Sequence, residues 1–137
     1  MWRTNRAIVP RLNAVLADHG LRRTTFATLA VVVENPGLHQ GAVAEALAIE
    51  RPNFVQIVDE LEKANLLSRE RAPDDKRAYA LKPTQAGVQL YRRTHREVRK
   101  YDEALIDGLS KSELDTLDRV LGVITANMEM MEAEDGY

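Results

Sequence analysis

Two carboxamide side chains, Asn53 and Gln56, stand three residues apart and could read the edges of base pairs. A carboxamide combines a donor with an acceptor, which is the arrangement that distinguishes base pairs in the major groove of DNA. Arg51 beside them could bind guanine or a phosphate, and Gln40 upstream is expected to bind a phosphate. The alternative is a solvated polar helix face. If the fold places these residues together, they predict a nucleic-acid interface.

A second group of charged residues follows in the sequence. A long cation at the tip of a hairpin can enter a narrow minor groove, where the negative potential is enhanced. We expect Arg77 to do so, with Asp75 as its orienting partner, because a carboxylate near DNA is unfavourable unless it is paired. Arg69, Arg71 and Lys76 are expected to add non-specific affinity for phosphates. The alternative is a charged turn that only keeps the protein in solution.

Other chemistry has little support in the sequence. There is no cysteine, which excludes disulfides and thiolate metal sites. The histidines His19, His39 and His95 are dispersed and lack carboxylate neighbours at metal-ligand spacing, so we expect each to be structural and no metal to bind. Glycine-rich phosphate loops and nucleophile elbows are missing from the sequence. We therefore expect neither an enzyme nor a bound cofactor.

Charge is distributed unevenly along the chain. The net charge is −2, but residues 51–100 hold 12 basic and 7 acidic side chains, whereas residues 101–137 hold 2 and 10. A basic middle suits phosphate binding, and an acidic end can be kept away from the phosphates. An ordinary mixed surface remains the alternative.

Length and composition favour one globular domain over residues 1–137, with 45% hydrophobic residues available for a core and for a partner. We find no signal-peptide pattern in residues 1–10 and no apolar run of about 20 residues. The expected location is the cytoplasm, without contact to a membrane.

Hydrophobic periodicity predicts a helix-turn-helix followed by a hairpin. A short helix is expected at 40–47, and Pro52 opens a longer amphipathic helix, since proline at a first helical position loses no intrahelical bond. Beyond Asn65 the period changes from 3.6 to 2, which predicts a β-hairpin with its turn at 72–75. The buried stripe of the longer helix is expected to be Phe54, Ile57, Val58 and Leu61.

Two further helices are predicted upstream. One covers residues 4–19, and Pro10 should kink or delay it. The next ends at Asn35, and its core-facing stripe is predicted at i, i+3, i+4 and i+7. That stripe consists of Phe26, Leu29, Ala30 and Val33.

Two long helices are predicted downstream, one from Thr84 to about Gly108 and a last one that Ser110 and Glu113 begin with a capping box. The last helix has the three-four spacing of a coiled-coil seam. Because one small domain offers such helices too little surface, they predict a homodimer, and an intramolecular helical hairpin is the alternative. The seam residues are Leu114, Leu117, Leu121, Ile124, Met128 and Met131.

The predicted fold class is mainly α (α+β): a winged helix-turn-helix at 21–83 with long helical dimerisation regions at 1–20 and 84–137. This order of elements resembles the MarR family of winged-helix regulators along nearly the whole chain. The short region before the first helix, and Phe54 where the family often has valine, depart from the family pattern. The resemblance is carried by 36–40 with Val43, Ala44 and Leu47, by Phe54, 57–59 and 61–63, and by 72–78 with Leu81 and 84–87.

The resemblance implies the wing roles given above for Asp75 and Arg77, a homodimer, a pseudo-palindromic double-stranded DNA operator, and a small aromatic or phenolic effector. The effector would lie between the dimerisation helices and the winged region. An apolar pocket with a cation for a carboxylate could form there, although the same residues could equally be core and surface. The candidate pocket residues are Phe26, Tyr91 and His95, with Arg11, His19, Arg22 or Arg23 nearby.

The residues and the resemblance together lead us to expect a sequence-specific DNA-binding regulator. The resemblance implies a repressor released by an aromatic or phenolic acid or an acyl-CoA thioester. The alternative from another class is a winged-helix module that contacts protein and responds to no ligand.

Overall fold

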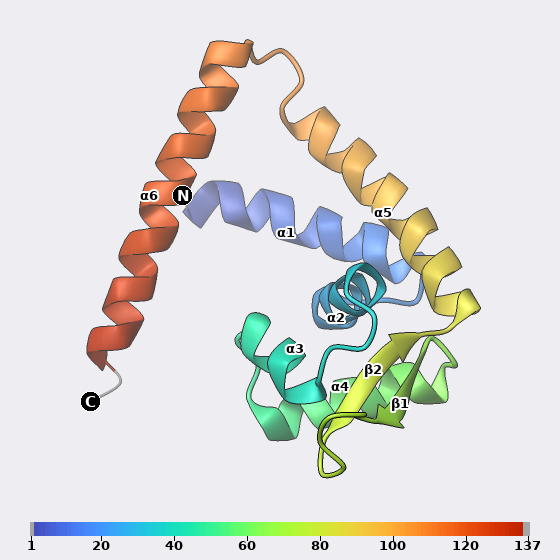
Figure 1. The fold of residues 1–137 in the computed structure, drawn as a ribbon. Coiled ribbons are helices and arrows are strands. Elements are labelled where there is room, and N and C mark those ends of the chain that lie inside the picture. Colours follow the sequence, from blue (N-terminus) through green and yellow to red (C-terminus); the bar gives the residue numbers. More distant parts are fainter. Residues whose placement is uncertain (1, 136–137) are drawn as a thin grey trace. The chain divides into compact units, whose positions relative to one another are not determined.

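The computed structural model describes residues 2–135, and the side chains of residues 3–131. They form a mainly helical fold with one two-stranded antiparallel sheet, which confirms the predicted class (Figure 1). Two compact units, residues 1–101 and 102–137, are described separately below. The elements are α1 (Trp2–Ala17), α2 (Arg23–Glu34), α3 (Gln40–Ala46), α4 (Arg51–Lys63), β1 (Leu67–Arg71), β2 (Tyr79–Pro83), α5 (Gln85–Leu105) and α6 (Lys111–Asp135).

The helix-turn-helix is formed by α3 and α4, and its core face is the predicted one. The apolar stripe of α4 is buried, with exposed fractions between 0 and 6%. Pro52 occupies the second helical position and not the first, where its missing N–H is equally harmless. Burial of this stripe fixes the rotation of α4, so the opposite face, with Asn53 and Gln56, is exposed.

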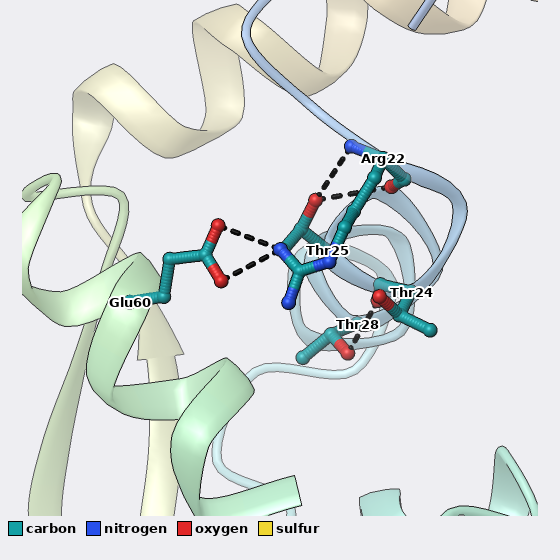
Figure 2. Close-up of polar contacts among 5 residues, drawn as sticks. All are labelled: Arg22, Thr24, Thr25, Thr28 and Glu60. Atoms are coloured by element: carbon teal, nitrogen blue, oxygen red, sulfur yellow. Dashed lines mark hydrogen bonds and ion pairs between the residues drawn. The ribbon is translucent and has the colours of Figure 1, made fainter. Parts of the chain in front are cut away.

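The buried face of α2 differs from the predicted stripe. Leu29 is buried as expected, but Phe26, Ala30 and Val33 are only half-buried. Thr25, Thr28 and Val32 are buried in their place. Each threonine hydroxyl is satisfied within its own helix: Thr28 donates to the carbonyl oxygen of Thr24 at 2.8 Å, and Thr25 to that of Arg22 at 3.0 Å (Figure 2). A satisfied hydroxyl can enter a core, so the polar character of threonine misled the prediction.

The first helix runs through Pro10 without a delay. It begins at Trp2, so the expectation that Pro10 would postpone the helix is wrong. Pro10 is exposed, and water can therefore satisfy the carbonyl group that its missing N–H leaves unbonded. At the other end Leu16 is buried in the core of the first unit, and the hydroxyl of Tyr101 on α5 donates to the carbonyl oxygen of Ile8 at 2.8 Å.

The wing is a five-residue antiparallel ladder in which Leu67 pairs with Pro83 and Arg71 with Tyr79. The loop 72–78 closes on itself through the N–H of Ala72, which donates to the carbonyl oxygen of Ala78 at 3.1 Å. The segment before α3 adds to the outer edge of β2, because Leu81 donates to the carbonyl oxygen of Leu38 at 2.9 Å. The hairpin is thereby tied to the start of α3.

The second unit is dominated by α6. The predicted capping box is present: the Glu113 carboxylate accepts from the Ser110 N–H at 2.8 Å, and the Glu113 N–H donates to the Ser110 hydroxyl at 3.3 Å. Much of the predicted seam is exposed to solvent, with 39% exposure at Leu117 and 51% at Leu121. No helix among residues 2–135 combines the length and apolar character that crossing a bilayer needs.

Candidate nucleic-acid interface

A hollow of about 540 Å³ lies between α3, the start of α4 and the wing. Four of the predicted DNA-binding residues line it, namely Gln40, Arg51, Asp75 and Arg77. The fold therefore brings together positions that are up to 37 residues apart in the sequence. Arg51 and Arg77 are exposed and have no ion-pair partner among the side chains that the structure describes. The hollow thus presents to solvent two guanidinium groups that are not ion-paired, although Glu45 and Asp75 also line it.

Asn53 and Gln56 are exposed on α4 but lie outside the lining of this hollow. Val55 lines the hollow in place of these two residues and is 39% exposed. Val55 was not among the residues predicted to bind DNA, although an apolar residue on the polar face of an otherwise regular amphipathic helix was a visible signal. In a major groove such a side chain suits the methyl group of thymine.

At the wing tip, Asp75 bonds to the backbone of Arg77 and not to its guanidinium group. Its carboxylate accepts from the N–H of Arg77 at 2.9 Å, and its carbonyl oxygen accepts from the N–H of Ala78 at 3.0 Å. An aspartate that bonds to the backbone two residues on fixes a turn. The Arg77 side chain consequently projects from a defined backbone.

Arg71 and Arg69 make different contacts on the hairpin. The guanidinium of Arg71 donates to the carbonyl oxygen of Lys76 at 3.1 Å and stacks over Tyr79, 4.5 Å from the ring centre. That of Arg69 bonds to Glu62 at 2.8 Å and to Asp59, both on α4. The hydrogen bond from Arg69 lowers the pKa of Glu62, and the same bond raises the pKa of Arg69. Arg69 therefore joins the wing to α4, a role that the charge pattern did not reveal.

A second link joins the wing to α3. His39, at the start of α3, bonds through Nε2 to a carboxylate oxygen of Asp74 at 2.9 Å. This bond lowers the pKa of Asp74, which is exposed. His39 was expected to be structural. Its contact with Asp74, which joins the start of α3 to the wing, agrees with that expectation. The hairpin tip is thus held by α3 on one side, while Arg69 holds the hairpin to α4.

The predicted effector residues fall into two groups. Phe26, Tyr91 and His95 come together, with ring centres 6.0 Å apart for the first pair and 5.3 Å for the second. The Tyr91 hydroxyl donates to Glu34, and burial together with this bond raises the pKa of Tyr91 to about 12. His95 was expected to be a structural residue, yet its side chain is exposed.

The predicted cations form the second group. Arg22 bonds to both carboxylate oxygens of Glu60 on α4 at 2.6 Å (Figure 2). His19 lines a separate hollow between the end of α1 and α5. Arg11 and Arg23 are exposed and line neither of the hollows on α5. Among residues 2–135, no group of three or more histidine, aspartate or glutamate side chains is arranged to hold a metal.

A MarR family model matches residues 19–78. A putative transcriptional regulatory protein for the hcr operon of Thauera aromatica is 34% identical over 103 residues, which are 75% of this chain and 62% of that relative. The chain therefore spans less than two thirds of that relative's length.

Solved structures extend the likeness to most of the chain. The transcriptional repressor CouR, solved bound to a 23-mer DNA duplex, is 30% identical, with a TM-score of 0.82 over 90% of this chain and 87% of that one. The PcaV transcriptional regulator of Streptomyces coelicolor, solved with its natural ligand, shares the fold at 22% identity, with a TM-score of 0.79 over 90% and 87% of the two chains. The chain belongs to the MarR family of transcriptional regulators.

Proposed function

We propose that this protein binds specific double-stranded DNA through α3, α4 and the wing, and represses transcription by occupying an operator. The observation that carries the proposal is the hollow in which the unpaired guanidinium groups of Arg51 and Arg77 meet the start of α3. Unpaired cations beside a helix-turn-helix release counterions from a phosphate backbone, which drives binding. CouR, the 30% identical neighbour, was solved on DNA.

The residues divide by role. Asn53 and Gln56 read base edges from the exposed face of α4, and Gln40 binds a phosphate at the start of α3. Arg77 enters the minor groove, while Lys76 and Arg71 add phosphate contacts. Asp75 and Arg69 act by positioning, since the first fixes the turn before Arg77 and the second ties the wing to α4.

The functional unit proposed is a homodimer on a pseudo-palindromic operator, with two α4 helices in successive major grooves about one helical turn apart. The apolar side chains exposed along α6 suit a second copy of the chain, because a soluble protein rarely leaves such a stripe in water.

Release by a small aromatic or phenolic acid, or by its acyl-CoA thioester, completes the proposal. The rings of Phe26, Tyr91 and His95 offer it an apolar surface. Arg22 offers a route to the DNA-reading helix, because it now holds Glu60 of α4 (Figure 2). The carboxylate of the free acid could compete for Arg22 and so free that end of α4. Either ligand would favour a dimer whose α4 helices are wrongly spaced.

The wing assignment is tested by Arg77→Ala. Binding to operator and to unrelated DNA should weaken alike, and the slope of log K against log salt should fall by about one unit, because one phosphate-linked cation is lost. Electrophoretic mobility shifts on the DNA upstream of the gene, over a salt titration, measure both. Arg119→Ala, which removes the same charge from exposed α6, is the matched control. An unchanged slope contradicts the wing assignment, and a wild-type protein with no salt-dependent DNA binding indicates a protein-interaction module.

The base-reading assignment is tested by Gln56→Ala. Selection from a pool of randomised operators should show relaxed preference at one position of each half-site, worth about 1–3 kcal/mol, since one bidentate contact is removed. Gln40→Ala is the comparison: as a phosphate contact it should weaken binding evenly and leave the selected sequence intact. If Gln56→Ala selects the wild-type operator at every position, Gln56 does not read a base.

A further inference from the structure

A basic segment of α5 lies outside the DNA-facing hollow. Five cationic side chains and a single acidic one, Glu97, fall between Arg92 and Lys100. None of them lines the hollow between α3, α4 and the wing. In Figure 1, α1 lies above α2 within the first unit. The helix α3 and the wing tip lie below α2. The proposed DNA contacts therefore leave this segment without a role.

Two hollows open along the segment, and Arg93 and Arg96 line both of them. The first, of about 560 Å³, lies between α5 and the end of α1, and is also lined by Lys100 and His19. The second, of about 570 Å³, is also lined by Tyr91. Arg93 and Arg96 are exposed and have no ion-pair partner among the described side chains. Two unpaired guanidinium groups thus stand where a polar hollow joins an aromatic one.

We propose that Arg93 and Arg96 bind the phosphate groups of a small-molecule effector whose aromatic or acyl part lies beside Tyr91. This rests on the effector response proposed above and specifies a phosphorylated ligand. Each guanidinium presents a planar fork of N–H donors that matches phosphate oxygens, and two forks can share one phosphate or hold a pair of them. A lone carboxylate would fill one fork and leave the second unpaired.

Two carboxylates in the first hollow restrict where the anion can lie. Lys100 donates to Glu97 at 2.9 Å, and this bond lowers the pKa of Glu97, whose charge is thereby compensated. Asp18 has no ion-pair partner among the described side chains and would repel a phosphate at its end of the hollow. The phosphate position is therefore on α5, beside Arg93 and Arg96, where the second hollow begins.

The aromatic end of the site is set by Tyr91. Tyr91 is buried, with 8% exposed, and its hydroxyl already donates to Glu34. It can therefore offer a ligand only the part of its side chain that lines the second hollow. The ring of His95 lies 5.3 Å from that of Tyr91 and lines the same hollow. Neighbouring aromatic side chains favour a flat apolar group over a sugar or a chain of hydroxyl groups.

The test is isothermal titration calorimetry on the full chain with benzoate, coenzyme A and benzoyl coenzyme A. Benzoyl coenzyme A should bind more tightly than either part. The double variant Arg93→Gln, Arg96→Gln should lose about tenfold or more in affinity for both coenzyme A probes, because two charge-assisted contacts are removed, and keep its affinity for benzoate. The pair Arg3→Gln, Arg119→Gln removes the same charge elsewhere on the exposed surface and should bind every probe as the wild type does.

Three results would overturn the phosphate site. In the first, the wild type and the Arg93/Arg96 variant bind coenzyme A with equal affinity. In the second, neither coenzyme A probe binds at millimolar concentration. In the third, the Arg3/Arg119 control loses as much affinity for these probes as the Arg93/Arg96 variant does. A fall of about two units in the salt slope of operator binding for the Arg93/Arg96 variant would assign the segment to DNA instead. Operator binding by the ligand-free wild type is measured separately, so failure of the DNA proposal can be told apart from failure of this one.

Discussion

Replacing Gly87 by alanine should destabilise the protein by about 2–3 kcal/mol or more and lower its melting temperature by about 10 °C, because the added methyl group meets a rigid backbone. A Cβ at this position would lie 1.9 Å from the carbonyl oxygen of Leu66 and 2.9 Å from its carbonyl carbon. Neither atom belongs to a side chain that could rotate away. The backbone between α4 and β1 would have to move, and the wing with it.

The close approach is maintained by Thr84, just before α5. Its N–H donates to the carbonyl oxygen of Leu66 at 3.1 Å, and its hydroxyl donates to that of Asn65 at 2.7 Å. The same hydroxyl accepts from the N–H of Gly87 at 3.0 Å and so caps the helix. Asn65 itself has a positive φ of 56°, which turns the chain out of α4. The start of α5 is thus fastened to the turn that leads into the wing.

The measurement is thermal and urea unfolding followed by circular dichroism, with Gly41→Ala as the matched control. Gly41 lies in α3 with nothing within 4 Å of its added Cβ, so alanine there should leave the free energy of unfolding unchanged or raise it by up to about 1 kcal/mol. A Gly87→Ala protein that melts within about 2 °C of the wild type would show that the turn yields easily, and the packing argument would then fail.

Gly87 also shows what a sequence pattern can and cannot supply. The segment 84–87 helped to carry the resemblance to the MarR family, but the sequence offered no physical reason for its glycine. That reason is the distance to Leu66, on a segment that α4 and the hairpin place beside α5. Close approaches between elements depend on tertiary packing, so the spacing of residue types does not report them.

Periodic features were predictable because they depend on one element at a time. The stripe of α4 and the change of period at the wing needed only the geometry of a helix and a strand, and the structure confirms both. The face of α2 failed because Thr25 and Thr28 satisfy their hydroxyl groups locally and then pack like apolar residues. Hydrophobicity alone does not contain that information.

The partners of charged residues were the least predictable part of the candidate site. Arg69 was expected to face phosphates, yet its guanidinium is held by Asp59 and Glu62, and only 20% of its side chain is exposed. Arg22 was expected to face a ligand and instead holds Glu60. Opposite charges that lie 7 to 38 residues apart meet only after the chain has folded. Contacts of the proposed DNA-reading residues with bases stay predictions for the same reason, since their partner is a second molecule.

Leu121→Glu should convert the proposed dimer to a monomer at micromolar concentration and reduce operator affinity about 100-fold or more, because a monomer binds only one half-site. Leu121 lies on the three-four seam of α6, where it is 51% exposed in a single chain. Burial of such a leucine contributes about 1.5–3 kcal/mol, and it occurs twice in a symmetric pair. Glutamate at this position removes that stabilising free energy and places two like charges in an apolar contact.

Ala126→Glu is the matched control, since it adds the same carboxylate to the opposite face of α6, at an exposed position. Analytical ultracentrifugation gives the oligomeric state, and mobility shifts on full and half operators give the affinities. If a second copy covers the seam, Leu121→Glu should sediment as a monomer, bind a half operator as the wild-type half-site does, and lose only the advantage of the full operator. Ala126→Glu should behave as the wild type throughout.

A wild-type chain that sediments as a monomer, with Leu121→Glu altering only its melting temperature, would assign the seam to a helical hairpin within one chain. The recognition helices would then have no fixed spacing for a ligand to change, so the proposed release mechanism depends on this result as much as the dimer does.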